Sequence, residues 1–217
     1  TLNVAVGNYA LDALTSGDNN TATGHYALGA LTTASNNTAF GFSALRVNTG
    51  ASNTAVGANS LYANTGAENS ALGMYALYNN TTGGQNTAVG ESALITSTTA
   101  SNNVAVGKSA LEANTTGTRN IAIGVQAYDA SDTENDNIAI GYQAMTTNTA
   151  GGQYNIAIGN YAADALTSGD NNIVMGHNAA SNLTSGGNNT VVGFDALLAT
   201  TTQSNNTAFG YQGLRAN

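Results

Sequence analysis

A short block of largely apolar residues, bounded by an asparagine and a glycine, recurs along the chain. Residues 120–124 (NIAIG) show its pattern, an Asn-x-(Ala or Val)-x-Gly frame that is found thirteen times between Asn3 and Gly210. Successive frame glycines lie 17 residues apart, except for two gaps of 16 and one of 18. Alternation with period 2 among β-branched residues is typical of strands, and a short fixed period is typical of solenoids. The sequence therefore predicts an all-β fold, a parallel β-roll or β-solenoid of about 13 rungs of ~17 residues.

Each position of the frame has a structural interpretation. The glycine supplies a positive φ or lets backbone pass closely, and the asparagine can stack with its counterparts so that each amide bonds the next. The residue before the glycine is large and apolar in twelve frames, so we expect it to line the interior with the leucine of the following Ala-Leu pair. The residue after the glycine varies from Asn8 through Lys108 to Phe194 and is expected to face solvent.

The residue two before the glycine should then point away from the interior, where a polar side chain is expected. It is instead alanine in eleven frames and valine in two. Small apolar side chains at successive levels indicate a surface that is buried between copies of the same chain. The predicted interface of a homotrimer consists of Ala5, Ala22, Ala39, Ala55, Ala71, Ala88, Ala105, Ala122, Ala139, Ala157, Val174, Val191 and Ala208.

Composition and charge make some classes of binding partner unfavourable for this chain. The repeats run without interruption, so residues 1–217 are predicted to form a single β-roll repeat domain, a fragment of a longer fibrous protein. Only 7% of the residues are charged and the net charge is -8, which disfavours nucleic acid and anionic membranes. Cysteine is absent, and the apolar runs are far shorter than the ~20 residues that span a bilayer. We expect no membrane contact by this segment.

The sequence contains no arrangement of residues that predicts catalysis, and we expect neither an enzyme nor a cofactor. The frame glycines are not a phosphate-binding loop, because the Gly-x-x-x-x-Gly-Lys pattern is missing. One return loop is rich in acidic residues, which could hold a calcium ion through oxygen ligands or could form a solvated acidic loop. These residues are Asp129, Asp132, Glu134 and Asp136.

The frame and its continuation resemble a known repeat. Residues 137–144 (NIAIGYQA) are similar to the Asn-Ser-Val-Ala-Ile-Gly-x-x-Ala core of the head repeats of trimeric autotransporter adhesins, the YadA-like heads. They are also similar to the fibre repeats that precede phage-type intramolecular chaperone domains. The resemblance covers the whole chain. It implies a left-handed parallel β-roll, assembled as a homotrimer on the bacterial outer surface or in a virion fibre.

This interpretation makes the chain a structural and adhesive fibre segment that attaches to host cells, matrix or glycans, with a surface glycan or protein receptor as its partner. Candidate contact residues are the aromatic side chains Tyr9, Tyr26, Phe42, Tyr75, Tyr142, Tyr161, Phe194 and Tyr211. Two alternatives stay open. One is a monomeric β-solenoid that binds ice, although the residue three before the glycine changes from threonine to isoleucine along the chain. The other is a spacer without binding function in a phage tail fibre.

Overall fold

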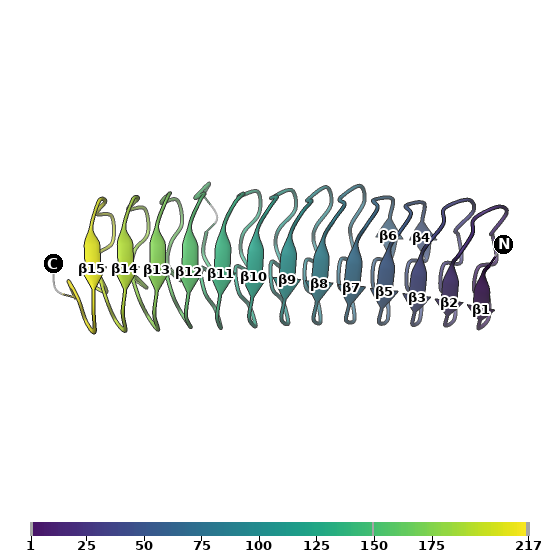
Figure 1. Cartoon of the computed structure of the whole chain (residues 1–217), viewed down its shortest axis with the longest axis horizontal. Helices are drawn as coiled ribbons and strands as arrows, with labels where there is room; N and C mark the ends of the chain where they lie inside the picture. Colours follow the sequence, from purple (N-terminus) through teal and green to yellow (C-terminus); the bar gives the residue numbers. More distant parts are fainter. Residues whose placement is uncertain (1, 149, 216–217) are drawn as a thin grey trace. The chain divides into compact units, whose positions relative to one another are not determined.

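The protein was described from a computed structural model, which covers residues 2–148 and 150–215. It consists of two compact units, Thr1–Lys108 (unit 1) and Ser109–Asn217 (unit 2), and each is described by itself. Within the described residues, both units contain short parallel strands, turns and loops and no helix. Figure 1 labels the strands. The predicted all-β parallel β-solenoid is confirmed in each unit, whereas a single domain over 1–217 stays a prediction.

Unit 1 has a main sheet and a small second sheet. The main sheet consists of β1 (Val4–Val6), β2 (Thr21–Thr23), β3 (Thr38–Phe40), β5 (Thr54–Val56), β7 (Ser70–Leu72), β8 (Thr87–Val89) and β9 (Val104–Val106). These strands pair in parallel and in order, so that equivalent positions of successive frames are neighbours. The second sheet pairs β4 (Val47–Asn48) with β6 (Ala63–Asn64). It lies in the part of the chain where the repeat shortens to 16 residues.

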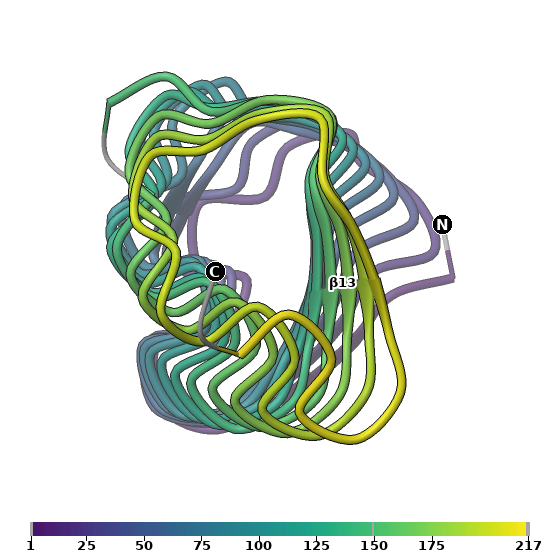
Figure 2. The same cartoon turned by 90° about the vertical axis from the view of Figure 1, so that its left-hand side faces the viewer.

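Unit 2 repeats the main sheet. Its strands are β10 (Ile121–Ile123), β11 (Ile138–Ile140), β12 (Ile156–Ile158), β13 (Ile173–Met175), β14 (Thr190–Val192) and β15 (Thr207–Phe209). They also pair in parallel and in frame register. Figure 2, which looks along the stack, shows the β13 side of the coil and the turns and loops that complete each circuit. The extra residue of the 18-residue repeat falls outside the strands, because strand pairing keeps their length constant.

The predicted direction of the strand side chains is wrong. The central residue of every main-sheet strand except β1 lies in the coil interior, and Ala55 and Ala139 are both 0% exposed. The flanking residues face outward, for example Phe40 at 58% and Leu72 at 50% exposure. The residues that the structure buries inside one chain are Ala22, Ala39, Ala55, Ala71, Ala88, Ala105, Ala122, Ala139, Ala157, Val174, Val191 and Ala208. Ala5, in the edge strand β1, is exposed.

This reversal corrects the predicted trimer interface. The alanines and valines cannot contact another copy while the coil is closed, because their side chains pack inside it. Their small size is explained by the space they share with larger side chains from the turn, such as Leu77 and Leu94, which are fully buried as predicted. Interiors pack densely, so a row of constant, small residues belongs inside while variable residues face outward. A contact between copies through the sheet would use the outward-facing rows.

The glycine corner and the asparagine ladder are confirmed. Gly141 has φ of +138°, and a Cβ on it would lie 2.4 Å from the carbonyl oxygen of Gly159. Only glycine fits both the dihedral angle and the close approach. In the ladder, the backbone N–H of Asn172 donates to the side-chain oxygen of Asn155 at 3.0 Å, and its side-chain amide donates to the same atom at 3.0 Å. Each ladder asparagine therefore links two rungs and satisfies polar groups inside the coil.

A second interior row was missed. Three residues after the buried leucine, unit 1 places Asn48, Asn64 and Asn80, all fully buried. The Asn64 amide donates to Asn48 at 2.9 Å, and the Asn80 amide donates to Asn64 at 2.6 Å. The equivalent residues in part of unit 2 are Leu166 and Leu183, also buried. This position thus accepts asparagine, where amides bond from rung to rung, or leucine.

Candidate functional surfaces

The outward side of the main sheet carries two rows of side chains in each unit. In unit 1, the first row is hydroxylic: Thr21, Thr38, Thr54 and Ser70 are exposed and Thr87 is half-buried. In unit 2, the equivalent row begins with Ile121, Ile138, Ile156 and Ile173, of which the first three are half-buried and the last is exposed. The first row is therefore hydroxylic from Thr21 to Thr87 in unit 1, between Val4 and Val104 at its ends, and mainly isoleucine in unit 2. The second row is largely apolar in both units.

The apolar surface of unit 2 is widened by its second row. Ile123, Ile140, Ile158 and Met175 lie one residue before the frame glycines, and strand pairing places each beside its counterpart. Ile123 is 39% exposed and Met175 40% exposed. Together with Ile121, Ile138, Ile156 and Ile173, these residues form what we call the isoleucine face. Contiguous exposed apolar areas of this kind usually mark interaction sites.

The aromatic candidates of unit 1 form local clusters. The Tyr9 and Tyr26 rings stack with centroids 4.9 Å apart, and the Phe42 ring stacks on His25 at 5.5 Å. The Arg46 guanidinium lies over the Tyr26 ring at 4.3 Å, a cation–π contact. Tyr75 is in a separate cluster, where it meets Tyr78 edge to face at 5.5 Å.

In unit 2, the aromatic candidates form a continuous row. Tyr142 contacts Tyr161 edge to face at 5.4 Å, and Tyr161 contacts His177 at 5.9 Å. Phe194 stacks on His177 at 5.3 Å and on Tyr211 at 5.4 Å. Tyr142, Phe194 and Tyr211 are exposed. The structure therefore brings all four unit 2 candidates together, and His177 joins two parts of the row.

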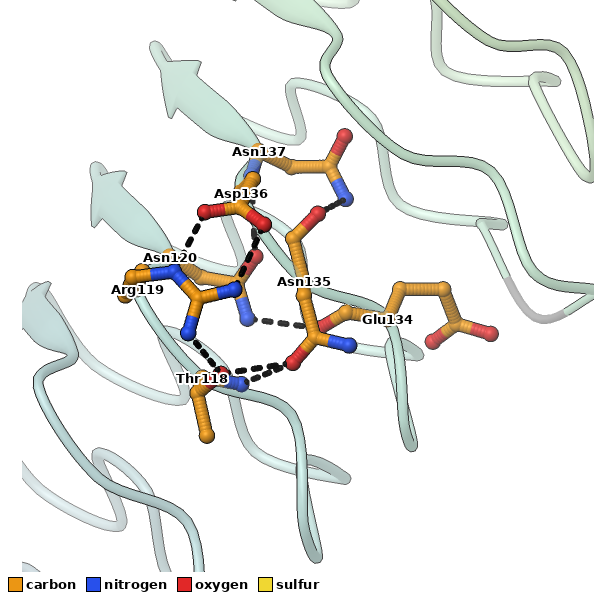
Figure 3. A network of polar contacts seen from close by, with 7 residues as sticks. All are labelled: Thr118, Arg119, Asn120, Glu134, Asn135, Asp136 and Asn137. Atoms are coloured by element: carbon orange, nitrogen blue, oxygen red, sulfur yellow. Dashed lines mark hydrogen bonds and ion pairs between the residues drawn. The ribbon is translucent and has the colours of Figure 1, made fainter.

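The acidic loop does not gather its carboxylates around one point. Figure 3 shows Asp136 facing Arg119, with two oxygen–nitrogen contacts of 2.6 and 2.7 Å. These hydrogen bonds hold the pKa of the Asp136 carboxyl below its usual range. Glu134 is buried, and its carboxylate accepts hydrogen bonds from the backbone of Asp132 at 2.9 Å and Gly151 at 3.0 Å. Within residues 2–148 and 150–215 there is no group of three or more acidic, histidine or cysteine side chains that could hold a metal ion.

The remaining two acidic residues of the loop, Asp132 and Asp129, have different surroundings. Asp132 accepts a hydrogen bond from the Thr115 hydroxyl. Asp129 is partly buried, and this burial raises the pKa of its carboxyl. The inward turn of Glu134 was not predicted, and it depends on the backbone N–H groups that the loop directs at its carboxylate. Glycine occupies the equivalent place in several other repeats, such as Gly117, and this departure is the signal that sequence inspection could have used.

Tyr128 is a further buried group that was not predicted. Its hydroxyl accepts hydrogen bonds from the side-chain amides of Asn137 at 2.5 Å and Asn148 at 3.0 Å. Burial raises the pKa of Tyr128. It fills the place of the usual interior leucine, so the larger ring and its hydroxyl link the two interior asparagine rows in unit 2.

The fold and surfaces define a parallel β-solenoid, and comparison adds no narrower class. No known protein-family model, curated protein or solved structure matches the chain. No pocket is formed by the residues that the structure describes. Among the same residues, no helix is long and apolar enough to cross a membrane.

Proposed function

We propose that this chain is a structural and adhesive segment of a homotrimeric surface fibre, a bacterial adhesin head or a phage-like fibre. In this proposal the coil is a left-handed roll of about 13 rungs of ~17 residues. It lies outside the cell, on the bacterial outer surface or in a virion, and attaches the fibre to host cells, matrix or glycans. Support comes from the repeat resemblance and from one structural observation, the isoleucine face of unit 2.

The isoleucine face supports self-association because it is apolar and repetitive. Ile138, Ile140, Ile156 and Ile158 lie on neighbouring strands in register, so their side chains form a regular apolar surface. Burial of apolar surface stabilises contacts by about 25 cal/mol per Å². Identical chains related by symmetry present the same surface to one another. Copies of this chain would thus cover a surface that water solvates poorly.

The adhesive part of the proposal uses the aromatic row of unit 2. Tyr142, Phe194 and Tyr211 are exposed on the turn that follows the frame glycine, away from the outward strand positions. Aromatic side chains supply apolar contact area, and tyrosine adds a hydroxyl that bonds a polar partner. This row is therefore available to a receptor glycan or protein when the isoleucine face is covered. We propose no catalytic reaction, metal or cofactor for this segment.

Light scattering on the size-fractionated 217-residue chain tests the assembly. We expect three times the chain mass of 21.7 kDa at micromolar concentration. The double variant Ile138→Lys, Ile156→Lys should reduce the mass to that of one chain while the circular dichroism spectrum keeps its strand signal. Val125→Lys is the matched control, because Val125 is exposed but lies on the turn outside the strands. A native chain that is monomeric under these conditions would refute the trimer.

A glycan array tests adhesion separately. The fluorescently labelled chain should bind a defined subset of glycans, and Phe194→Ala with Tyr211→Ala should reduce the signal at least fivefold. Ile138→Lys should alter binding only through loss of multivalency. A chain that forms trimers but binds neither glycans nor host-cell protein would support the spacer alternative.

A further inference from the structure

The hydroxyl row on the sheet of unit 1 forms a regular array. Thr21, Thr38, Thr54, Ser70 and Thr87 are consecutive partners in the parallel register. Paired strands are about 4.8 Å apart, so the five hydroxyl groups repeat at that spacing along the sheet. We call these five residues the hydroxyl row.

Four residues of this row are exposed and Thr87 is half-buried, and their hydroxyls differ from other threonine hydroxyls in the same unit. On the loop side, Thr15 and Thr81 donate their hydroxyl hydrogens to carbonyl oxygens of the next rung at 2.9 and 2.8 Å. In the described part of unit 1, no side chain of the hydroxyl row makes a hydrogen bond within the protein. β-Branched threonine has few χ1 choices on a strand, which limits the directions of each hydroxyl and methyl.

The array rests on a rigid support. Ala39, Ala55 and Ala71 pack behind it in the coil interior with at most 2% exposure. Backbone hydrogen bonds join each strand to the next, as between the Thr38 N–H and the Asn53 carbonyl at 2.9 Å. A ligand that fits the array would therefore lose little affinity to ordering of the protein.

The absence of charged residues on these strands indicates what kind of ligand the hydroxyl row fits. The chain has a net charge of -8, yet none of the main-sheet strands described in unit 1 contains a charged residue. Neutral, repeating hydroxyl and methyl groups complement a neutral partner that donates and accepts hydrogen bonds at a short, regular repeat. The water lattice at an ice surface has this chemistry and a repeat close to the strand spacing. We propose that the hydroxyl row of unit 1 binds ice.

The neighbouring row determines how flat this surface is. Val56 and Val89 are about the height of threonine, whereas Phe40 and Leu72 are larger and are 58% and 50% exposed. A flat crystal surface would meet these two side chains first. Replacement of both by valine should therefore increase contact between the hydroxyl row and ice.

The test is ice-recrystallisation inhibition by the full 217-residue chain, with thermal hysteresis as a second readout. We expect inhibition by the native chain at micromolar concentration. Thr54→Tyr should require at least a tenfold higher concentration, whereas Thr82→Tyr, at an exposed loop threonine, should not change it. Phe40→Val with Leu72→Val should lower the required concentration at least twofold. Circular dichroism melting verifies that each variant is folded.

The same measurement on the Ile138→Lys, Ile156→Lys variant separates this inference from the proposed trimer. If assembly covers the hydroxyl row, ice binding should be stronger in the dissociated variant. Absence of activity in both the native and dissociated chains would overturn ice binding, whatever mass is found. Equal activity of the Thr54→Tyr and Thr82→Tyr variants would also overturn it. The trimer itself is judged by mass alone.

Discussion

Units 1 and 2 have the same kind of residue at the buried centre of the main-sheet strands and different residues at the outward strand positions. Ala55 and Ala139 occupy equivalent central strand positions and are both fully buried, while the preceding residues are Thr54 and Ile138. Packing inside the coil limits the central position to small apolar residues, alanine or valine. Solvent imposes no such limit on the outward position. The comparison teaches that the repeat's constant residues build the coil, and that its variable residues determine the chemistry of the outer surface in each unit.

The largest expected effect is disruption of the shared interior. Ala55→Lys and Ala139→Lys each place a charged side chain where there is neither space nor an opposite charge. We expect each to destabilise its unit by at least about 4 kcal/mol, in the range of severe core substitutions. Urea unfolding followed by circular dichroism measures this. Thr54→Lys and Ile138→Lys, one residue away but outward-facing, are the controls. Similar stability of Ala139→Lys and Ile138→Lys would contradict the assigned directions.

The glycine corner should be nearly as sensitive in both units. An alanine Cβ at Gly57 would meet the Gly73 carbonyl oxygen at 2.5 Å, and one at Gly141 would meet that of Gly159 at 2.4 Å. Strain in this region of φ costs about 1 to 3 kcal/mol before the clash is added. We expect losses of about 3 kcal/mol or more at both. Gly151→Ala is the control, since its φ is +97° but a Cβ would meet no atom within 4 Å. Thermal melting should rank it as the mildest.

The second interior row should respond differently in the two units. Asn64→Leu in unit 1 removes the acceptor of one Asn80 N–H and leaves that buried group unsatisfied, while the Asn48 oxygen still accepts the Gly50 N–H. Each such group costs about 1 to 3 kcal/mol, and we expect a loss of about 2 kcal/mol. Leu166→Met in unit 2 preserves an apolar contact and should cost less than about 1.5 kcal/mol. Chemical denaturation compares them. A larger effect at Leu166 would show that the asparagine row contributes little.

A smaller, pH-dependent effect is expected at Asp164 in unit 2. Burial raises the pKa of its carboxyl, and one carboxylate oxygen has no hydrogen-bond partner in the described structure. Since the folded pKa is above the unfolded value, the favourable contribution is complete below about pH 4 and is lost as the pH rises through the folded pKa. Asp164→Asn should therefore raise the melting temperature at pH 7 by a few degrees and leave it unchanged at pH 3. Asp12→Asn, at the exposed equivalent position of unit 1, is the matched control variant.

The repeat was sufficient to predict the parallel coil, its glycine corners and its asparagine ladder. These features recur because each has one physical solution, as Gly141 and Asn155 illustrate. The interior leucines were also foreseen, because each follows the corner at a constant distance. The regular spacing of the loops indicated where length changes would be accepted.

The strand direction was not foreseen, because period 2 separates two faces without saying which is inside. Size provides the missing signal: the central position is always Ala or Val, whereas the position before the glycine accepts Thr23, Phe40 and Met175. The strand position that varies least in size is the one that lies inside the coil. The environment of Glu134 and the contacts between Tyr161 and His177 depend on loop shape and on side-chain angles. Residue spacing alone predicts neither the environment of Glu134 nor the contact between Tyr161 and His177.

Cysteine labelling measures the inward and outward directions most directly, because the native chain contains no cysteine. Single variants Ala139→Cys, Ile138→Cys and Val125→Cys would be treated with a maleimide under native conditions and again in urea. We predict that Cys at 125 reacts at once, that Cys at 139 reacts only on unfolding, and that Cys at 138 becomes more protected as the chain concentration rises. Reaction at 139 under native conditions as fast as at 125 would contradict the account.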